Sequence, residues 1–182
     1  MGEVEASHLR PLGHLVALDE PYQHYQFAGR ADLVAVDVER NALLHLENRT
    51  RFPDIQRFAG SWNAKRAYLA AEVAPRLGIA ALRSQTHVVV ALWSSEILHS
   101  LRLREETFRS LCPDPADSFQ AWWTGTPPAE RRSTSSLVIL DPLPGRRTSR
   151  RRWVGLDDIR TVVPRYRGYA EALSALREAR LA

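Results

Sequence analysis

The chain has 182 residues, which is enough for one well-buried domain and too few to divide comfortably into two. Hydrophobic residues make up 45% and charged residues 25%, close to the globular average, and this composition argues against global disorder and against a membrane protein. A net charge of +4 and a pI near 9.7 permit nucleic-acid binding without requiring it.

The first ten residues, MGEVEASHLR, are polar and acidic, unlike a signal peptide. The longest apolar run, residues 88–93, is far shorter than the roughly 20 residues that a membrane span needs. We therefore expect a cytoplasmic protein with no membrane partner. The single cysteine, Cys112, cannot form an internal disulfide, and we expect it to be a small buried hydrophobe.

Residues 22–50 alternate and then run apolar in short bursts, which predicts two or three adjacent strands. The stretch VDVERNA is the only break between residues 33–38 and 42–46, so these two runs are predicted to form a tight antiparallel hairpin. A helix is expected to follow, because Pro53 and Asp54 suit its start and Gly78 its end, with apolar residues at helical spacing between them.

The second half of the chain continues the mixed pattern. We expect a single α/β domain over residues 1–182, with a mixed central sheet flanked by helices. The expected elements are a buried strand at 86–93, a helix or helix pair at 94–112, a flexible loop at 124–136, a strand at 137–142 and a closing amphipathic helix at 165–182.

The hairpin would gather charged side chains at its open end. If the chain turns about residues 39 and 40, Asp32 faces Glu47 and Arg30 faces Arg49. Two carboxylates about 4 Å apart repel by roughly 4 kcal/mol at an effective dielectric near 20, so something must neutralise them. Two solutions remain open: an ionic cluster with Arg30 and Arg49, or a Mg²⁺ ion bound by the two carboxylates.

Three matching positions give the segment a family likeness: Asp32 in GRADLVAVD, Glu47 in LLHLENR, and Gln56 in PDIQRFAGSWNAKR. An Asp on one strand, Glu-x-Lys on the next, and then a helix carrying Gln resembles the PD-(D/E)XK nuclease superfamily. Within it, residues 22–75 look like small actinobacterial proteins whose core often accompanies a helix-turn-helix regulator domain. The resemblance implies a restriction-endonuclease-like fold, with Mg²⁺ held by Asp32 and Glu47 activating a water.

The segment departs from that pattern at Arg49, which stands where the superfamily has lysine. An arginine can stabilise phosphate charge but cannot give up a proton at neutral pH, so the departure predicts weak or lost cleavage. Lys65, the only lysine, lies nine residues after Gln56, on the opposite side of an ideal helix. We therefore predict that Gln56 leans toward the carboxylates and that Lys65 is solvated. His45, two residues before Glu47, is predicted to share its face.

An arginine cluster and an adjacent tryptophan are candidates for contacts with nucleic acid. Trp153 could stack on a base, although a solvated loop is an equal alternative. The cluster comprises Arg146, Arg147, Arg150, Arg151 and Arg152.

Together these features predict a nucleic-acid-binding protein of nuclease-like fold with weak or lost cleavage activity, DNA being the expected nucleic acid. One alternative is an active Mg²⁺-dependent deoxyribonuclease that uses Asp32, Glu47, Arg49 and Gln56. The other is a regulatory or protein-interaction module with a purely structural ionic cluster. A homodimer or a separate DNA-reading partner is left open.

Overall fold

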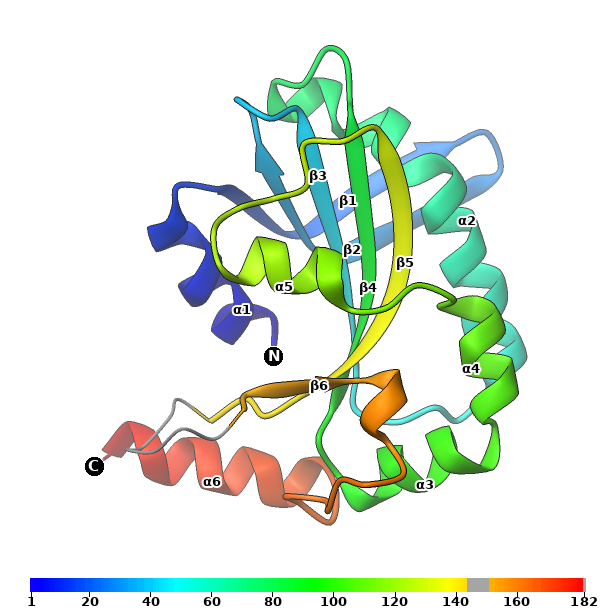
Figure 1. Cartoon of the computed structure of the whole chain (residues 1–182), viewed down its shortest axis with the longest axis vertical. Coiled ribbons are helices and arrows are strands. Elements are labelled where there is room, and N and C mark those ends of the chain that lie inside the picture. The colour runs from blue at the N-terminus through cyan, green and yellow to red at the C-terminus, as the bar shows by residue number, and fades with distance from the viewer. Residues whose placement is uncertain (144–150, 182) are drawn as a thin grey trace.

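Six strands form one mixed sheet in the spatial order β1-β2-β3-β4-β5-β6 (Figure 1). The computed structural model describes residues 1–143 and 151–181. Neighbouring strands run antiparallel from β1 to β3, parallel from β3 to β5, and antiparallel again between β5 and β6. The strands are β1 (Leu15–His24), β2 (Phe27–Asp37), β3 (Ala42–Arg49), β4 (Ser84–Leu92), β5 (Arg132–Leu140) and β6 (Trp153–Gly155).

Helices cover both faces of this sheet. One face packs against α1 and α5, and the other against α2, α3, α4 and the start of α6, because side chains alternate between the two faces along each strand (Figure 1). The α-helices are α1 (Gly2–Leu9), α2 (Ile55–Val73), α3 (Ser95–Leu103), α4 (Glu105–Leu111), α5 (Asp117–Trp123) and α6 (Tyr169–Leu181), and the 3₁₀ turns are η1 (Arg10–Leu12), η2 (Pro75–Leu77) and η3 (Leu156–Asp158).

The predicted hairpin is confirmed, with its predicted register. Leu33 pairs with Leu46, Val34 with His45, and the pairing continues to Asp37 with Ala42. The turn is closed by Asn41, whose positive φ of 50° a short polar side chain tolerates. Continued by one residue, this register places Asp32 opposite Glu47.

The predicted central helix is also confirmed, as α2. Asp54 caps its first turn, where the side chain accepts a hydrogen bond from the Arg57 amide at 2.9 Å. Gly78 ends the following η2 turn in the left-handed region, with φ +90°. Helix α2 buries one stripe against the sheet, made of Phe58, Trp62, Lys65, Leu69, Ala70 and Val73.

Several elements differ from the sequence prediction. Helix α1, helix α5, strand β6 and residues 15–21 of β1 were not predicted; in β1, Asp19, Glu20 and Pro21 interrupt the apolar run of residues 15–18. Strand β5 begins at Arg132, so residues 132–136 belong to the sheet rather than to the loop predicted for 124–136. These residues are mostly serine and threonine, yet they pair with β4 along their whole length.

Other expectations hold. Residues 94–112, predicted to form a helix or a helix pair, form the two helices α3 and α4, and Cys112 is buried with 3% exposure. Within the described residues, no helix combines the length and apolar character needed to cross a membrane.

Candidate functional site

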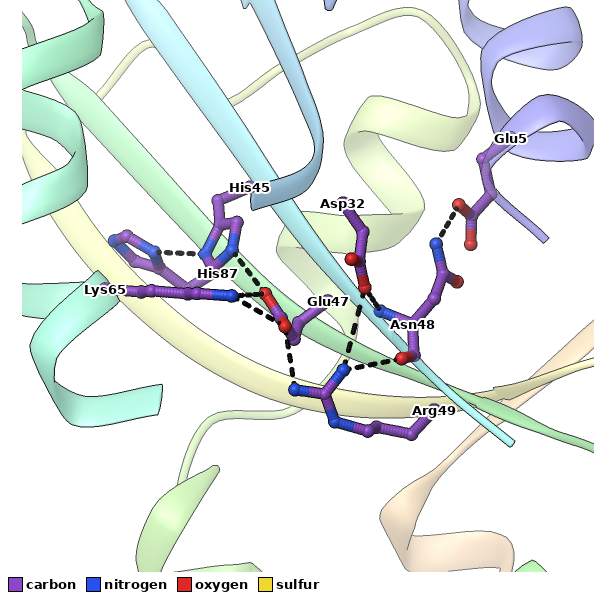
Figure 2. Close-up of polar contacts among 8 residues, drawn as sticks. All are labelled: Glu5, Asp32, His45, Glu47, Asn48, Arg49, Lys65 and His87. Carbon is purple, nitrogen blue, oxygen red and sulfur yellow. Dashed lines mark hydrogen bonds and ion pairs between the residues drawn. The ribbon is translucent and has the colours of Figure 1, made fainter. Parts of the chain in front are cut away.

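A chain of polar contacts runs across the sheet from His87 on β4 to Glu5 on α1, as Figure 2 shows. It passes through the open end of the β2–β3 hairpin, where charged residues were predicted to gather. Side chains from two strands and two helices meet the β3 segment His45–Arg49 there. The eight residues are Glu5, Asp32, His45, Glu47, Asn48, Arg49, Lys65 and His87.

Glu47 is the centre of this cluster and is almost fully buried, with 3% of its side chain exposed. The Lys65 ammonium donates to both of its oxygens, at 2.7 Å to Oε1 and 2.6 Å to Oε2. Arg49 donates to Oε1 at 2.7 Å, and His45 Nε2 lies 3.2 Å from Oε2. Each oxygen therefore has two donors, which matches its two lone pairs.

These donors keep Glu47 ionised. Burial alone would raise the pKa of its carboxyl group, but the hydrogen bond from His45 and the charges of Lys65 and Arg49 together lower this pKa to about 2. The predicted need for neutralising charge is thus met by the protein itself.

The contacts of Glu47 also fix the proton positions on two buried histidines. A carboxylate can only accept, so His45 donates from Nε2; burial lowers the pKa of His45, so its Nδ1 is left unprotonated. His87 Nδ1, 3.2 Å away, must then be the donor of the pair. The prediction that His45 shares a face with Glu47 is confirmed, and His45 orients the carboxylate.

Arg49 connects the two carboxylates. Its Nη1 atom is 3.7 Å from Asp32 Oδ2, and its guanidinium lies over the Phe58 ring, 5.1 Å from the centroid. Asp32 also accepts a hydrogen bond from the backbone amide of Asn48 at 2.7 Å, and 38% of the Asp32 side chain is exposed. Burial and the neighbouring charge of Glu47 raise the pKa of Asp32, so this carboxylate is the less completely neutralised of the two.

Glu5, fully buried on α1, completes the chain. Its Oε2 accepts from Asn48 Nδ2 at 2.9 Å, while Glu5 Oε1 and Asn48 Oδ1 have no partner within the described residues. Burial raises the pKa of Glu5 to about 7. Sequence reasoning missed Glu5; the available signal was that it shares a helix face with Leu9, four residues later, which is buried.

The prediction for Lys65 was wrong. Gln56 and Lys65 do lie on opposite sides of α2, but Lys65 is the one that faces the sheet. It belongs to the buried stripe between Trp62 and Leu69, and its side chain is 7% exposed. Apolar residues recur at helical spacing along that face of α2, and Lys65 occupies one position in the same stripe.

The converse prediction, that Gln56 leans toward the carboxylates, is wrong for the same reason. Gln56 is exposed and lines a hollow beside Ser100 and Arg104. Arg30, the other expected partner of the carboxylates, instead pairs with Asp19 on β1 at 2.6 Å. Lys65 takes the place that the ionic-cluster interpretation gave to Arg30.

The predicted arginine cluster is only partly described. Arg146, Arg147 and Arg150 lie outside the described residues. Arg151 pairs with Asp158 at 3.0 Å. Arg152 places its guanidinium 5.7 Å from the centre of the Trp123 ring. Trp153 packs edge-on against Phe119, 5.1 Å between ring centres, and this contact favours a structural role over base stacking.

A different set of arginines borders the end of β3. Arg51, Arg104 and Arg167 are exposed, and their guanidinium groups form no ion pair or hydrogen bond within residues 1–143 and 151–181. Arg51 and Arg167 line a hollow of about 770 Å³, and Arg104 lines a second one of about 470 Å³. The loop that leaves β3 at Arg49 borders both hollows, and Arg51 lies two residues after Arg49 of the cluster.

The residues present do not fit a Mg²⁺ ion in this arrangement. A metal needs free oxygen lone pairs, and the four acceptor positions of Glu47 are already filled. In the part of the chain that the structure describes, no group of three or more His, Cys, Asp or Glu side chains is placed to hold a metal.

Comparison with known proteins gives no family assignment. Models of protein families, curated proteins and solved structures were each compared with the chain, and none of them matches it.

Proposed function

We propose that this chain is a nucleic-acid-binding protein with a restriction-endonuclease-like fold and weak or lost cleavage activity. The observation that carries the proposal is the saturated carboxylate: Glu47 occupies the expected metal-binding position on β3, but it binds Lys65 and Arg49. The element order supports the fold assignment, because Asp32 lies on β2, Glu47 on the adjacent β3, and the next element is the helix α2.

The binding surface is proposed to be the loop after β3. Arg51 and Arg167 line one hollow together with Glu96 and Glu171, and Arg104 lines the other together with Asp54, so three guanidinium groups are available there for phosphate contacts. Of the arginines suggested by the sequence, Arg151 and Arg152 already contact Asp158 and Trp123, which makes them weaker candidates.

Binding of duplex DNA, measured by fluorescence anisotropy over a series of salt concentrations, tests this proposal. Replacing Arg51, Arg104 and Arg167 together by alanine should weaken binding and reduce the slope of log K against log salt by roughly 3. The matched control replaces Arg83, Arg131 and Arg132, which are exposed at the opposite end of β4 and β5. Equal losses in both triple variants would reject the proposed surface, and no binding by the parent would reject the function.

Phosphodiester cleavage is a second candidate, but the site supports it less well. Lys65 brings an ammonium to Glu47 from α2, as a nuclease lysine would, yet together with Arg49 and His45 it fills the acceptor positions that a catalytic metal needs. Incubation of supercoiled plasmid with Mg²⁺ or Mn²⁺ decides between the candidates. Nicking by the parent that disappears in Glu47→Gln would establish the second candidate; no nicking supports the first.

A further inference from the structure

We infer that Lys65 is an internal cation that occupies, at the Glu47 carboxylate, the position that a bound metal ion would need. The geometry points to this role, because the ammonium contacts both oxygens of Glu47, at 2.7 and 2.6 Å, as a chelated cation would. Only 7% of the Lys65 side chain is exposed, so its donors are turned to the carboxylate rather than to water.

The charges balance without any ion. Asp32 and Glu47 contribute two negative charges, and Lys65 and Arg49 contribute two positive ones within the same contact chain. A divalent ion added to this group would leave an uncompensated double positive charge in a largely buried place. Such a charge is costly, so the ion and Lys65 exclude each other.

The fold also holds Lys65 in place. Its neighbours on the buried stripe of α2 are Trp62, with 1% exposure, and Leu69, with none. The Trp62 indole is itself tied down by a hydrogen bond to the Leu111 carbonyl at 3.2 Å. An ammonium that moved away from Glu47 would therefore lose its carboxylate partner in a largely buried place, which is costly.

This inference is independent of nucleic-acid binding, and it can be tested without nucleic acid. The probe is Mn²⁺, whose binding to the purified chain is measured by electron paramagnetic resonance and by titration calorimetry. Four proteins are compared: the parent, Lys65→Met, the double variant Lys65→Met with Glu47→Gln, and Arg57→Met. Arg57 is exposed on the same helix, so its replacement removes the same charge without touching the cluster.

We expect Lys65→Met to gain a Mn²⁺-binding site. Lys65→Met should bind Mn²⁺ at least about tenfold more tightly than the parent, because the hard oxygen ligands regain free lone pairs. The double variant and Arg57→Met should behave like the parent.

Three results would overturn the inference. They are binding by the parent as tight as that of Lys65→Met, no binding by either protein, or binding by Lys65→Met that survives the loss of Glu47. If Lys65→Met does not fold, Lys65→Gln keeps a polar side chain of similar length. Its melting temperature should then rise with millimolar Mn²⁺, whereas that of the parent should not.

Discussion

The buried carboxyl group of Glu5 should lower the stability of the protein at neutral and alkaline pH relative to acidic pH. Its pKa is raised from an ordinary value of 4.5 to about 7, so the folded state binds a proton that the unfolded state has already released between these values. The stabilising contribution of the protonated group is fully present below pH 4.5 and is lost as pH rises through 7. Each pH unit between the two pKa values corresponds to about 1.36 kcal/mol, giving about 3 kcal/mol in total.

Glu5→Gln should remove this loss. The glutamine resembles the protonated carboxyl group: its oxygen can accept from Asn48 Nδ2, and its amide can donate to Asn48 Oδ1, which otherwise has no partner in the described part of the chain. We expect the variant to match the parent within about 1 kcal/mol at pH 4 and to exceed it by about 3 kcal/mol at pH 8.

Urea denaturation at the two pH values measures these differences. Glu3→Gln is the control, because Glu3 is exposed in the same helix turn and its replacement removes the same charge. A stability difference between Glu5→Gln and the parent that does not change between pH 4 and pH 8 would refute the reasoning, as would a loss of stability at pH 8.

Three further predictions follow from the cluster and its surroundings. The pKa of Glu47 is lowered from 4.5 to about 2, so the stability that its ionised form contributes is present above pH 4.5 and should be lost as pH falls through 2. Over that range the difference in free energy of unfolding between the parent and Glu47→Gln should narrow by about 3 kcal/mol. Lys65→Met should destabilise the protein by about 3 kcal/mol, and adding Glu47→Leu should recover most of that loss in thermal melts, because the carboxylate is then no longer buried with too little positive charge. Cys112 is 3% exposed and burial raises its pKa to about 12, so a disulfide reagent should modify it only at the rate of unfolding; rapid modification of the native protein would contradict this burial.

The sequence was sufficient to predict the hairpin and its register. The short break between two apolar runs places the turn near residues 39 and 40, and the resulting pairing, with the period of two along each strand, brings Asp32, Glu47 and Arg49 to one end. His45 could be placed beside Glu47 by the same period of two. Local pattern decides such features, so no knowledge of distant segments was needed.

The partners of Glu47 and Asn48 could not be placed in this way, because they come from distant segments. Lys65 lies 18 residues beyond Glu47 and reaches it only because α2 docks with its lysine-bearing stripe inward. Glu5 meets Asn48 from a helix whose apolar signal is limited to a few residues, such as Ala6 and Leu9. The sequence predicts strand β5 to begin too late, because its first residues are mostly serine and threonine and carry no apolar signal. They nevertheless pair with β4.

The ion pair between Lys65 and Glu47 also bears on how helix α2 docks on the sheet during folding. Strands β2 and β3 are joined by a short turn, so their hairpin can form early and present Glu47 before α2 packs over it. Lys65 is the only lysine in the chain, and a helix docked one turn out of place would set Trp62 or Leu69 against the carboxylate. The ion pair between Lys65 and Glu47 thus stabilises only one docking position of α2 on the sheet. A chain carrying both Lys65→Met and Glu47→Leu should stay folded but lose this ion pair. Its α2 helix should then occupy more than one docking position, and its α2 amides should give more than one set of NMR signals.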